Sequence, residues 1–146
     1  MTTNQRHAPI LKLTILFTFL LAGLALADGH SEADATLEVA SQGMAGYTFA
    51  GAESLDGVNP TLTLERGMTY AFEVTAPGHP FYINTENTTG ASAAYEPAEG
   101  NGTSSGTILI TIPEDAPDML YYNCSIHAGM NGVIEVVDTQ AQDSSY

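Results

Sequence analysis

Apolar and polar residues alternate along most of the chain beyond residue 35, in short runs separated by turn residues. A period of two is the repeat of a β-strand that buries one face. Turn signals such as Asn59-Pro60, Arg66-Gly67 and Pro77-Gly78 lie between the runs, and no stretch has the pattern of an amphipathic helix. The expected strands, each with its apolar side chains on one face, cover 36–40, 46–50, 62–64, 68–74, 81–83, 108–112, 120–124 and 133–137.

About eight short strands at this spacing predict an all-β fold, an antiparallel sandwich or barrel. Residues 85–105 interrupt the pattern, because they are rich in Thr, Ser, Gly, Asn and Ala, with Tyr95 and Pro97 as the bulky exceptions. We expect this stretch to form a surface excursion. The last residues, 139–146, are polar and are expected to fray.

The amino-terminal residues have the pattern of a secretory signal. Arg6 and Lys12 precede an apolar run that is too short to span a bilayer, and Ala25-Leu26-Ala27 fits a small-residue cleavage site. A retained membrane anchor is the alternative, which the short run disfavours. We expect export to the periplasm or the extracellular space. The predicted parts are a cleavable signal peptide at 1–27, a flexible lead at 28–35, one folded domain at 36–138 and a polar tail at 139–146.

Acidic residues outnumber basic ones by 17 to 3, which gives a formal net charge of −14. Phosphate groups are repelled by such a charge, so we expect no binding to nucleic acid or to anionic lipid. After cleavage Arg66 would be the one strongly basic residue left, so the imbalance is mainly a shortage of Lys and Arg. The acids are spread along the chain, which favours a saline habitat over steering toward a basic partner.

One short segment concentrates the residues that can do chemistry. Cys124, His127 and Met130 form a Cys-x-x-His-x-x-Met array, which places a thiolate, an imidazole and a thioether within one loop between two strands. These donors favour copper. His79 has the same parity as the apolar residues of the strand at 81–83, so its side chain is expected on the core side. There it would complete two His, one Cys and a weak axial Met, the ligand set of blue-copper centres.

Each of these residues also has an ordinary explanation when it is taken alone. A lone Cys is most often a small buried apolar residue, Met130 could fill the core, and His79 could be a turn residue. Their joint arrangement on a β scaffold favours the metal site. A single Cys also excludes an intrachain disulfide and any zinc, iron–sulfur or dinuclear copper centre that needs several cysteines.

On these residues the sequence resembles the cupredoxins, small blue copper proteins such as plastocyanin, amicyanin and pseudoazurin. The resemblance is strongest in Gly78-His79-Pro-Phe-Tyr-Ile83 and in the stretch 120–130, whose short Cys-x-x-His-x-x-Met spacing is most like that of amicyanin. It implies a Greek-key β-sandwich with one type 1 copper, and one-electron transfer between redox partners through an exposed edge of the loop His. The ligands that it implies are His79, Cys124, His127 and Met130.

Two positions depart from the family pattern. The residue after the first His is usually Asn, whose backbone N–H supports the Cys sulfur, whereas Pro80 has no N–H to give. The residue before the loop His is often Pro in plastocyanin-like loops and is Ile126 here. Because hydrogen bonds to the ligands tune a metal centre, the first departure bears on the reduction potential.

A second copper site at the new amino terminus is a further hypothesis. Cleavage after Ala27 would expose Asp28-Gly29-His30, in which a free amine, two backbone nitrogens and an imidazole can form a square-planar site for Cu(II) or Ni(II). The favoured explanation is the ordinary one, a His without a metal in a loose lead.

The sequence therefore favours a soluble exported electron carrier with one copper that cycles between Cu(II) and Cu(I). It is not expected to be an enzyme, and a multicopper oxidase would need more His than the chain has. We expect a monomer, free of the membrane after signal cleavage, whose partner is another redox protein. The alternatives are a periplasmic copper storage or delivery protein, and a structural β-domain with a vestigial site.

Overall fold

The computed structural model describes residues 32–51 and 55–139. The predicted signal peptide, the Asp28-Gly29-His30 sequence and the tail beyond Thr139 lie outside these residues, so the hypotheses about them stay predictions. Among the described residues, no helix has the length and apolar character needed to cross a membrane.

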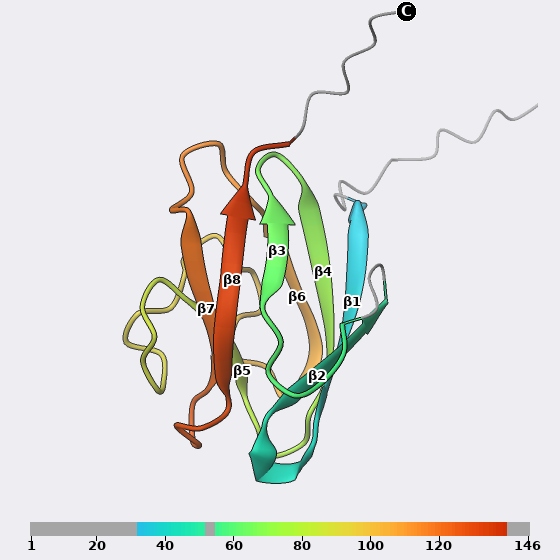
Figure 1. The fold of residues 1–146 in the computed structure, drawn as a ribbon, viewed down its shortest axis with the longest axis vertical. Coiled ribbons are helices and arrows are strands. Elements are labelled where there is room, and N and C mark those ends of the chain that lie inside the picture. Colours follow the sequence, from blue (N-terminus) through green and yellow to red (C-terminus); the bar gives the residue numbers. More distant parts are fainter. Residues whose placement is uncertain (1–31, 52–54, 140–146) are drawn as a thin grey trace, which may run out of the picture. The chain divides into compact units, whose positions relative to one another are not determined.

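Eight strands form two four-stranded sheets in the described part of the chain (Figure 1). The first sheet has the order β2 (Tyr47–Gly51), β1 (Ala35–Ser41), β4 (Thr69–Thr75) and β6 (Ser105–Thr111). The second has the order β3 (Leu62–Glu65), β8 (Asn131–Val137), β7 (Met119–Cys124) and β5 (Phe81–Asn84). One turn of 3-10 helix, Gly43–Ala45, lies between β1 and β2. The predicted all-β sandwich of about eight strands is confirmed.

Strand pairing is mixed, whereas the alternation of residues alone led us to expect antiparallel pairs. Four neighbouring pairs are antiparallel, but β1 runs parallel to β4 and β3 runs parallel to β8. The cause is the path of the chain, which leaves the first sheet after β2, contributes β3 to the second sheet and returns as β4. Such a long crossover lets a strand re-enter beside β1 in the same direction, which a short hairpin cannot do.

Inward-facing residues of both sheets meet in one apolar core, as the alternation predicts. Leu37 and Val39 of β1 are buried, as are Phe72 and Val74 of β4. On β4 the outer-face residues Thr69 and Ala71 are also buried, contrary to the simple alternation. The reason is position, because β4 lies between β1 and β6 and is screened on both sides.

The 85–105 stretch is a surface connection, but it also contributes to the core. Tyr95 and Ala98 are buried, and the Tyr95 N–H donates to the carbonyl of Ile83 at 2.9 Å. The Asn101 side chain binds both backbone groups of Ile83, each at 2.8 Å. These bonds fasten the excursion to β5, which limits the movement of the strand that follows His79.

An aromatic cluster fills the core beneath the end of the sandwich where β5 begins. Phe81 has no exposed surface and packs edge-on against Tyr47, with ring centroids 4.9 Å apart. It also stacks with Tyr122 at 5.6 Å and lies 6.0 Å from Phe49. Rings packed in this way give a stiff base, and β5 and β7 both extend from it to the candidate site.

Candidate metal centre

A tight turn delivers His79 to the end of the sandwich. Gly78 has a φ of +78°, a conformation that suits glycine, and the His79 N–H donates to the Ala76 carbonyl at 2.9 Å. β5 begins at Phe81, as expected, so His79 lies in the turn before the strand rather than on it. His79 is half-buried, and its ring turns toward the end of β7 rather than deep into the core.

Cys124 is the last residue of β7 and the start of a short closed loop. It pairs with Phe81 across the sheet, so the positions of His79 and Cys124 are coupled through β5 and β7. The Cys124 N–H donates to the Met130 carbonyl at 2.8 Å, and the Met130 N–H donates to the His127 carbonyl at 3.1 Å. These bonds fold the loop so that His127 turns back over the Cys sulfur.

Three of the four predicted ligands have their donor atoms close together. The Cys124 Sγ is 3.6 Å from Nδ1 of His127 and 4.0 Å from Nδ1 of His79. The two Nδ1 atoms are 3.2 Å apart. Cys124 and Met130 are fully buried, whereas both His are half-buried. The structure therefore assembles His79, Cys124 and His127 in one cluster and fixes Met130 beside them by its backbone.

These distances fit a shared metal ion. Metal–nitrogen and metal–sulfur bonds of about 2.1 and 2.3 Å place donor atoms roughly 3.4–3.8 Å apart around one ion. The observed separations are within a few tenths of an ångström of that range. A thiol and two imidazoles suit copper, and the site includes no carboxylate that would favour a hard cation.

Pro80 has no N–H to give to the Cys124 sulfur, but its carbonyl takes part in the hydrogen bonds around the site. The Ile126 N–H lies 3.5 Å from the Cys124 Sγ. The Pro80 carbonyl accepts the Ser125 N–H at 3.2 Å, which ties the His79 turn to the Cys124 loop. The Tyr47 hydroxyl donates to the His79 carbonyl in the same turn. Burial raises the pKa of this hydroxyl well above the ordinary value, and the neighbouring Cys124 side chain adds to the increase. The hydroxyl therefore keeps its proton.

Two residues near the site were not singled out by the sequence. The sequence pattern placed Tyr47 in an expected strand and Asn59 in an expected turn with Pro60. Asn59 is the one non-glycine among the described residues with a positive φ, +53°, which Asn tolerates better than most residues. An Asn-Pro pair at a turn is a signal for such a bend, but nothing in the sequence indicates its partners.

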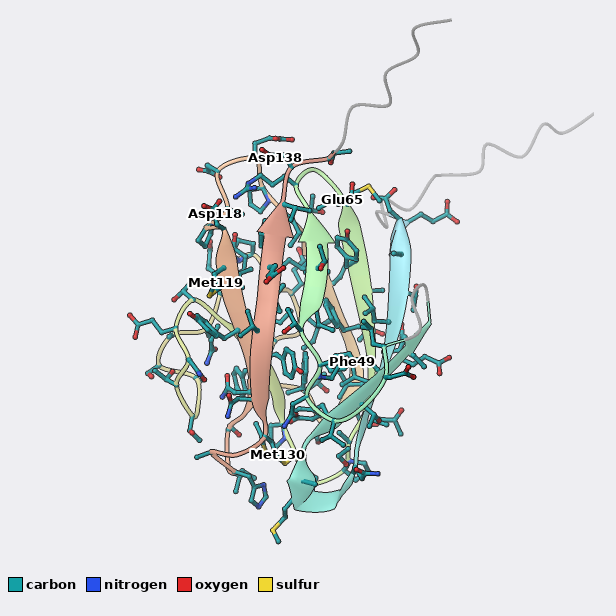
Figure 2. All side chains as sticks on the ribbon, in the orientation of Figure 1. Phe49, Glu65, Asp118, Met119, Met130 and Asp138 are labelled. Atoms are coloured by element: carbon teal, nitrogen blue, oxygen red, sulfur yellow. The ribbon has the colours of Figure 1, made fainter. Side chains whose placement is uncertain are left out.

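Charged side chains are missing from the segments that build this end of the sandwich. The segments 42–50, 57–62, 75–85 and 122–134 contain no Asp, Glu, Lys or Arg. Figure 2 shows Met130 at this end and Asp118, Asp138 and Glu65 at the opposite end. The candidate centre is therefore surrounded by neutral groups, although the chain as a whole is strongly acidic.

Comparison with known proteins gave distant structural neighbours. No protein-family model matches the chain, and neither does any curated protein. A copper protein, rusticyanin, is 23% identical with a TM-score of 0.46, covering 70% of this chain and 76% of that chain. Rusticyanin from Thiobacillus ferrooxidans gives 21% identity and a TM-score of 0.42 over the same shares of the two chains. A purple cupredoxin from Nitrosopumilus maritimus is 16% identical with a TM-score of 0.43, covering 71% of this chain and 100% of that chain.

Proposed function

We propose that the protein is an exported carrier of single electrons of the cupredoxin kind, with one type 1 copper held by His79, Cys124, His127 and Met130. The observation that carries this proposal is the cluster of one thiol and two imidazoles at ligand distances, on a β scaffold. When bound there, copper supplies a one-electron Cu(II)/Cu(I) couple.

Burial and rigidity of the donor groups support electron transfer. The thiol of Cys124 and the thioether of Met130 are closed off from solvent, so water is kept from one side of the ion. Both ends of the 124–130 loop are joined by the hydrogen bond from the Cys124 N–H to the Met130 carbonyl. A loop closed in this way changes little when the charge of the ion changes, which keeps the reorganisation small.

His127 is the proposed exit for the electron. It is half-buried, with its Nδ1 turned inward to the sulfur, so that the rest of its ring is nearer the surface. Its neighbour Ile126 is 61% exposed, and Ala128 and Gly129 are exposed as well. A redox protein that docks here would approach the ion through a single imidazole.

The remaining parts of the proposal concern context. We propose that the protein is periplasmic or extracellular after loss of its signal peptide, that it acts as a monomer and that it transforms no substrate. We propose no role in binding nucleic acid or membranes, because charges on the described residues are almost all acidic.

Storage or delivery of copper is the competing proposal for the same donors. The full burial of the Cys124 sulfur favours retention, because a delivery protein must present its thiolate to an acceptor. The experiment is to load the protein with copper, reduce and reoxidise it repeatedly beside a Cu(I) chelator, and measure the copper that stays bound. An electron carrier keeps its copper through many cycles, and loss within the first few cycles would favour delivery.

A further inference from the structure

The hydroxyl of Tyr47 lies against the backbone that carries one of the proposed ligands. Tyr47 has no exposed surface, and its hydroxyl is 2.9 Å from the His79 carbonyl and 3.2 Å from the Pro80 carbonyl. A tyrosine hydroxyl has one proton, so it donates to these two oxygens as a shared bond. This contact helps to hold the turn, because Pro80 has no N–H that could form a hydrogen bond there.

The same carbonyl of Pro80 connects the turn to the loop that carries the other ligands. It also accepts the N–H of Ser125, which directly follows Cys124. The Tyr47 hydroxyl thus acts where the two ligand-bearing segments meet. These segments are far apart in the sequence, so their separation is set by such contacts and by the pairing of β5 with β7.

Asn59 holds Tyr47 in place and reaches the far side of the loop. The Tyr47 N–H donates to the Asn59 Oδ1 at 2.8 Å, and the Asn59 N–H donates to the Tyr47 carbonyl at 2.8 Å. The Asn59 Nδ2 lies 3.3 Å from the Gly129 carbonyl, just before Met130. A Cβ at Gly46 would collide with the Asn59 side chain, so the contact is tightly packed.

We infer that Tyr47 and Asn59 form a bracket that sets the separation of His79 from the Cys124–Met130 loop before any metal binds. Tyr47 is a positioning residue in this bracket, and it acts through its hydroxyl. The role in metal binding rests on the proposed function, whereas the structural role does not. Donors that already stand at ligand distances bind an ion without reorganising, which is why partners behind the ligands matter to metal affinity.

Replacing Tyr47 by Phe tests the bracket, because it removes the hydroxyl and leaves the ring against Phe81. In the metal-free protein, we expect altered amide chemical shifts and faster hydrogen exchange at Ser125 and Met130. With Cu(II) added, we expect affinity to fall by about 10–100-fold, the range seen when partners behind metal ligands are lost. The thiolate-to-copper absorption band and the reduction potential should both shift.

Tyr70→Phe is the matched control. Tyr70 is also buried, and its hydroxyl accepts the N–H of Glu65, at the end of the sandwich opposite Met130 (Figure 2). This variant should lose stability as Tyr47→Phe does, but its copper band, potential and copper affinity should match the wild type. A purely structural effect would instead alter both variants in the same way and overturn the inference.

Asn59→Gly decides the matter if Tyr47→Phe does not fold. Glycine keeps the positive φ and removes the side-chain contacts to Ala45, Tyr47 and Gly129. The same changes at Ser125 and Met130 are therefore expected. Unchanged shifts, exchange, band and potential in a folded variant would overturn the inference. A wild type that binds no copper would overturn the proposed function instead, and the metal-free shifts and exchange rates would then decide the structural bracket alone.

Discussion

The two ends of the sandwich are held together by different kinds of interaction. At the candidate metal end, His79, Cys124 and His127 are supported by neutral hydrogen bonds from Tyr47 and Asn59. At the opposite end, the Arg66 guanidinium binds Asp118 at 2.6 Å and Asp138 at 3.0 Å. It also donates to the carbonyls of Ala116 and Val136, so the one cation among the described residues joins several segments.

This difference bears on the proposed metal site of a strongly acidic chain. Carboxylate oxygens prefer hard cations and would compete as ligands if they stood near the thiol. The segments that build this end contain none, and the acidic residues of the described chain lie at the opposite end, on strands and in other loops such as 85–105. The metal end is therefore expected to be insensitive to salt, whereas the Arg66 end is expected to weaken as ionic strength rises.

The largest expected effect comes from removing the aromatic base of the metal end. Phe81→Ala empties a fully buried site next to Tyr47 and Tyr122, and should lower the free energy of unfolding by about 3–5 kcal/mol. It should also disturb copper binding, because Phe81 pairs with Cys124. Urea unfolding and copper titration measure the two effects.

Ile110→Ala provides the control for that change. Ile110 is fully buried as well, but it pairs with Tyr70 at a distance from the ligands. This variant should lose about 2–5 kcal/mol and keep its copper band. If both variants changed the band equally, the two ends would not be separate units.

A smaller effect is expected at Asn59, where backbone strain and side-chain contacts add together. Asn59→Ala forces a positive φ of 53° on a residue that disfavours it and removes the bonds to Tyr47 and Gly129. We expect a loss of about 2 kcal/mol. Asn59→Gly lacks the same bonds, but glycine adopts the positive φ without strain. The difference in urea midpoint between the two variants therefore separates the effect of strain from that of the lost bonds. Equal midpoints would mean that strain contributes nothing.

Alkaline pH should weaken the metal end through its buried tyrosines. Burial raises the pKa of both Tyr47 and Tyr122 above the usual value. Both hydroxyls therefore stay protonated in the folded chain at a pH at which they already ionise in the unfolded chain. The unfolded state then binds fewer protons, and stability is fully present below about pH 10 and falls above it. The slope is about 1.4 kcal/mol per pH unit for each tyrosine. Tyr122→Phe should reduce this slope, and an unchanged slope would contradict the assignment.

The smallest effect is expected at the far end. Asp118 and Asp138 are 95% and 87% exposed, so their ion pairs with Arg66 contribute little on their own. Arg66→Gln should lower the midpoint of thermal unfolding slightly at low salt and less at high salt. Its copper band should be that of the wild type. A change in the band would show that the two ends are coupled.

Much of the fold could be predicted from local patterns. Alternation located all eight strands, because burial of one face acts on each strand separately. It could not give the parallel pairs β1–β4 and β3–β8, which depend on where the chain crosses between sheets. It also placed 85–105 entirely at the surface, because no pattern in the neighbouring sequence indicates that Tyr95 and Ala98 are buried in the core.

The candidate site likewise has parts that the sequence predicts and parts that it does not. Cys124 and His127 lie in one loop, so their proximity follows from their spacing in the sequence. His79 was predicted to join them because it has the same parity as the inward-facing residues of the strand at 81–83. The support from Tyr47 and Asn59 was not foreseen, because it joins segments 12 residues apart to two others much further along the chain. Such contacts become visible only when the tertiary structure is known.

The most direct test of the proposed function is a titration of the purified protein with Cu(II), followed by visible absorption. We predict an intense thiolate-to-copper band that saturates at one copper per chain and is absent from Cys124→Ser. A colourless protein that binds no copper, or a band that survives in Cys124→Ser, would contradict the proposal.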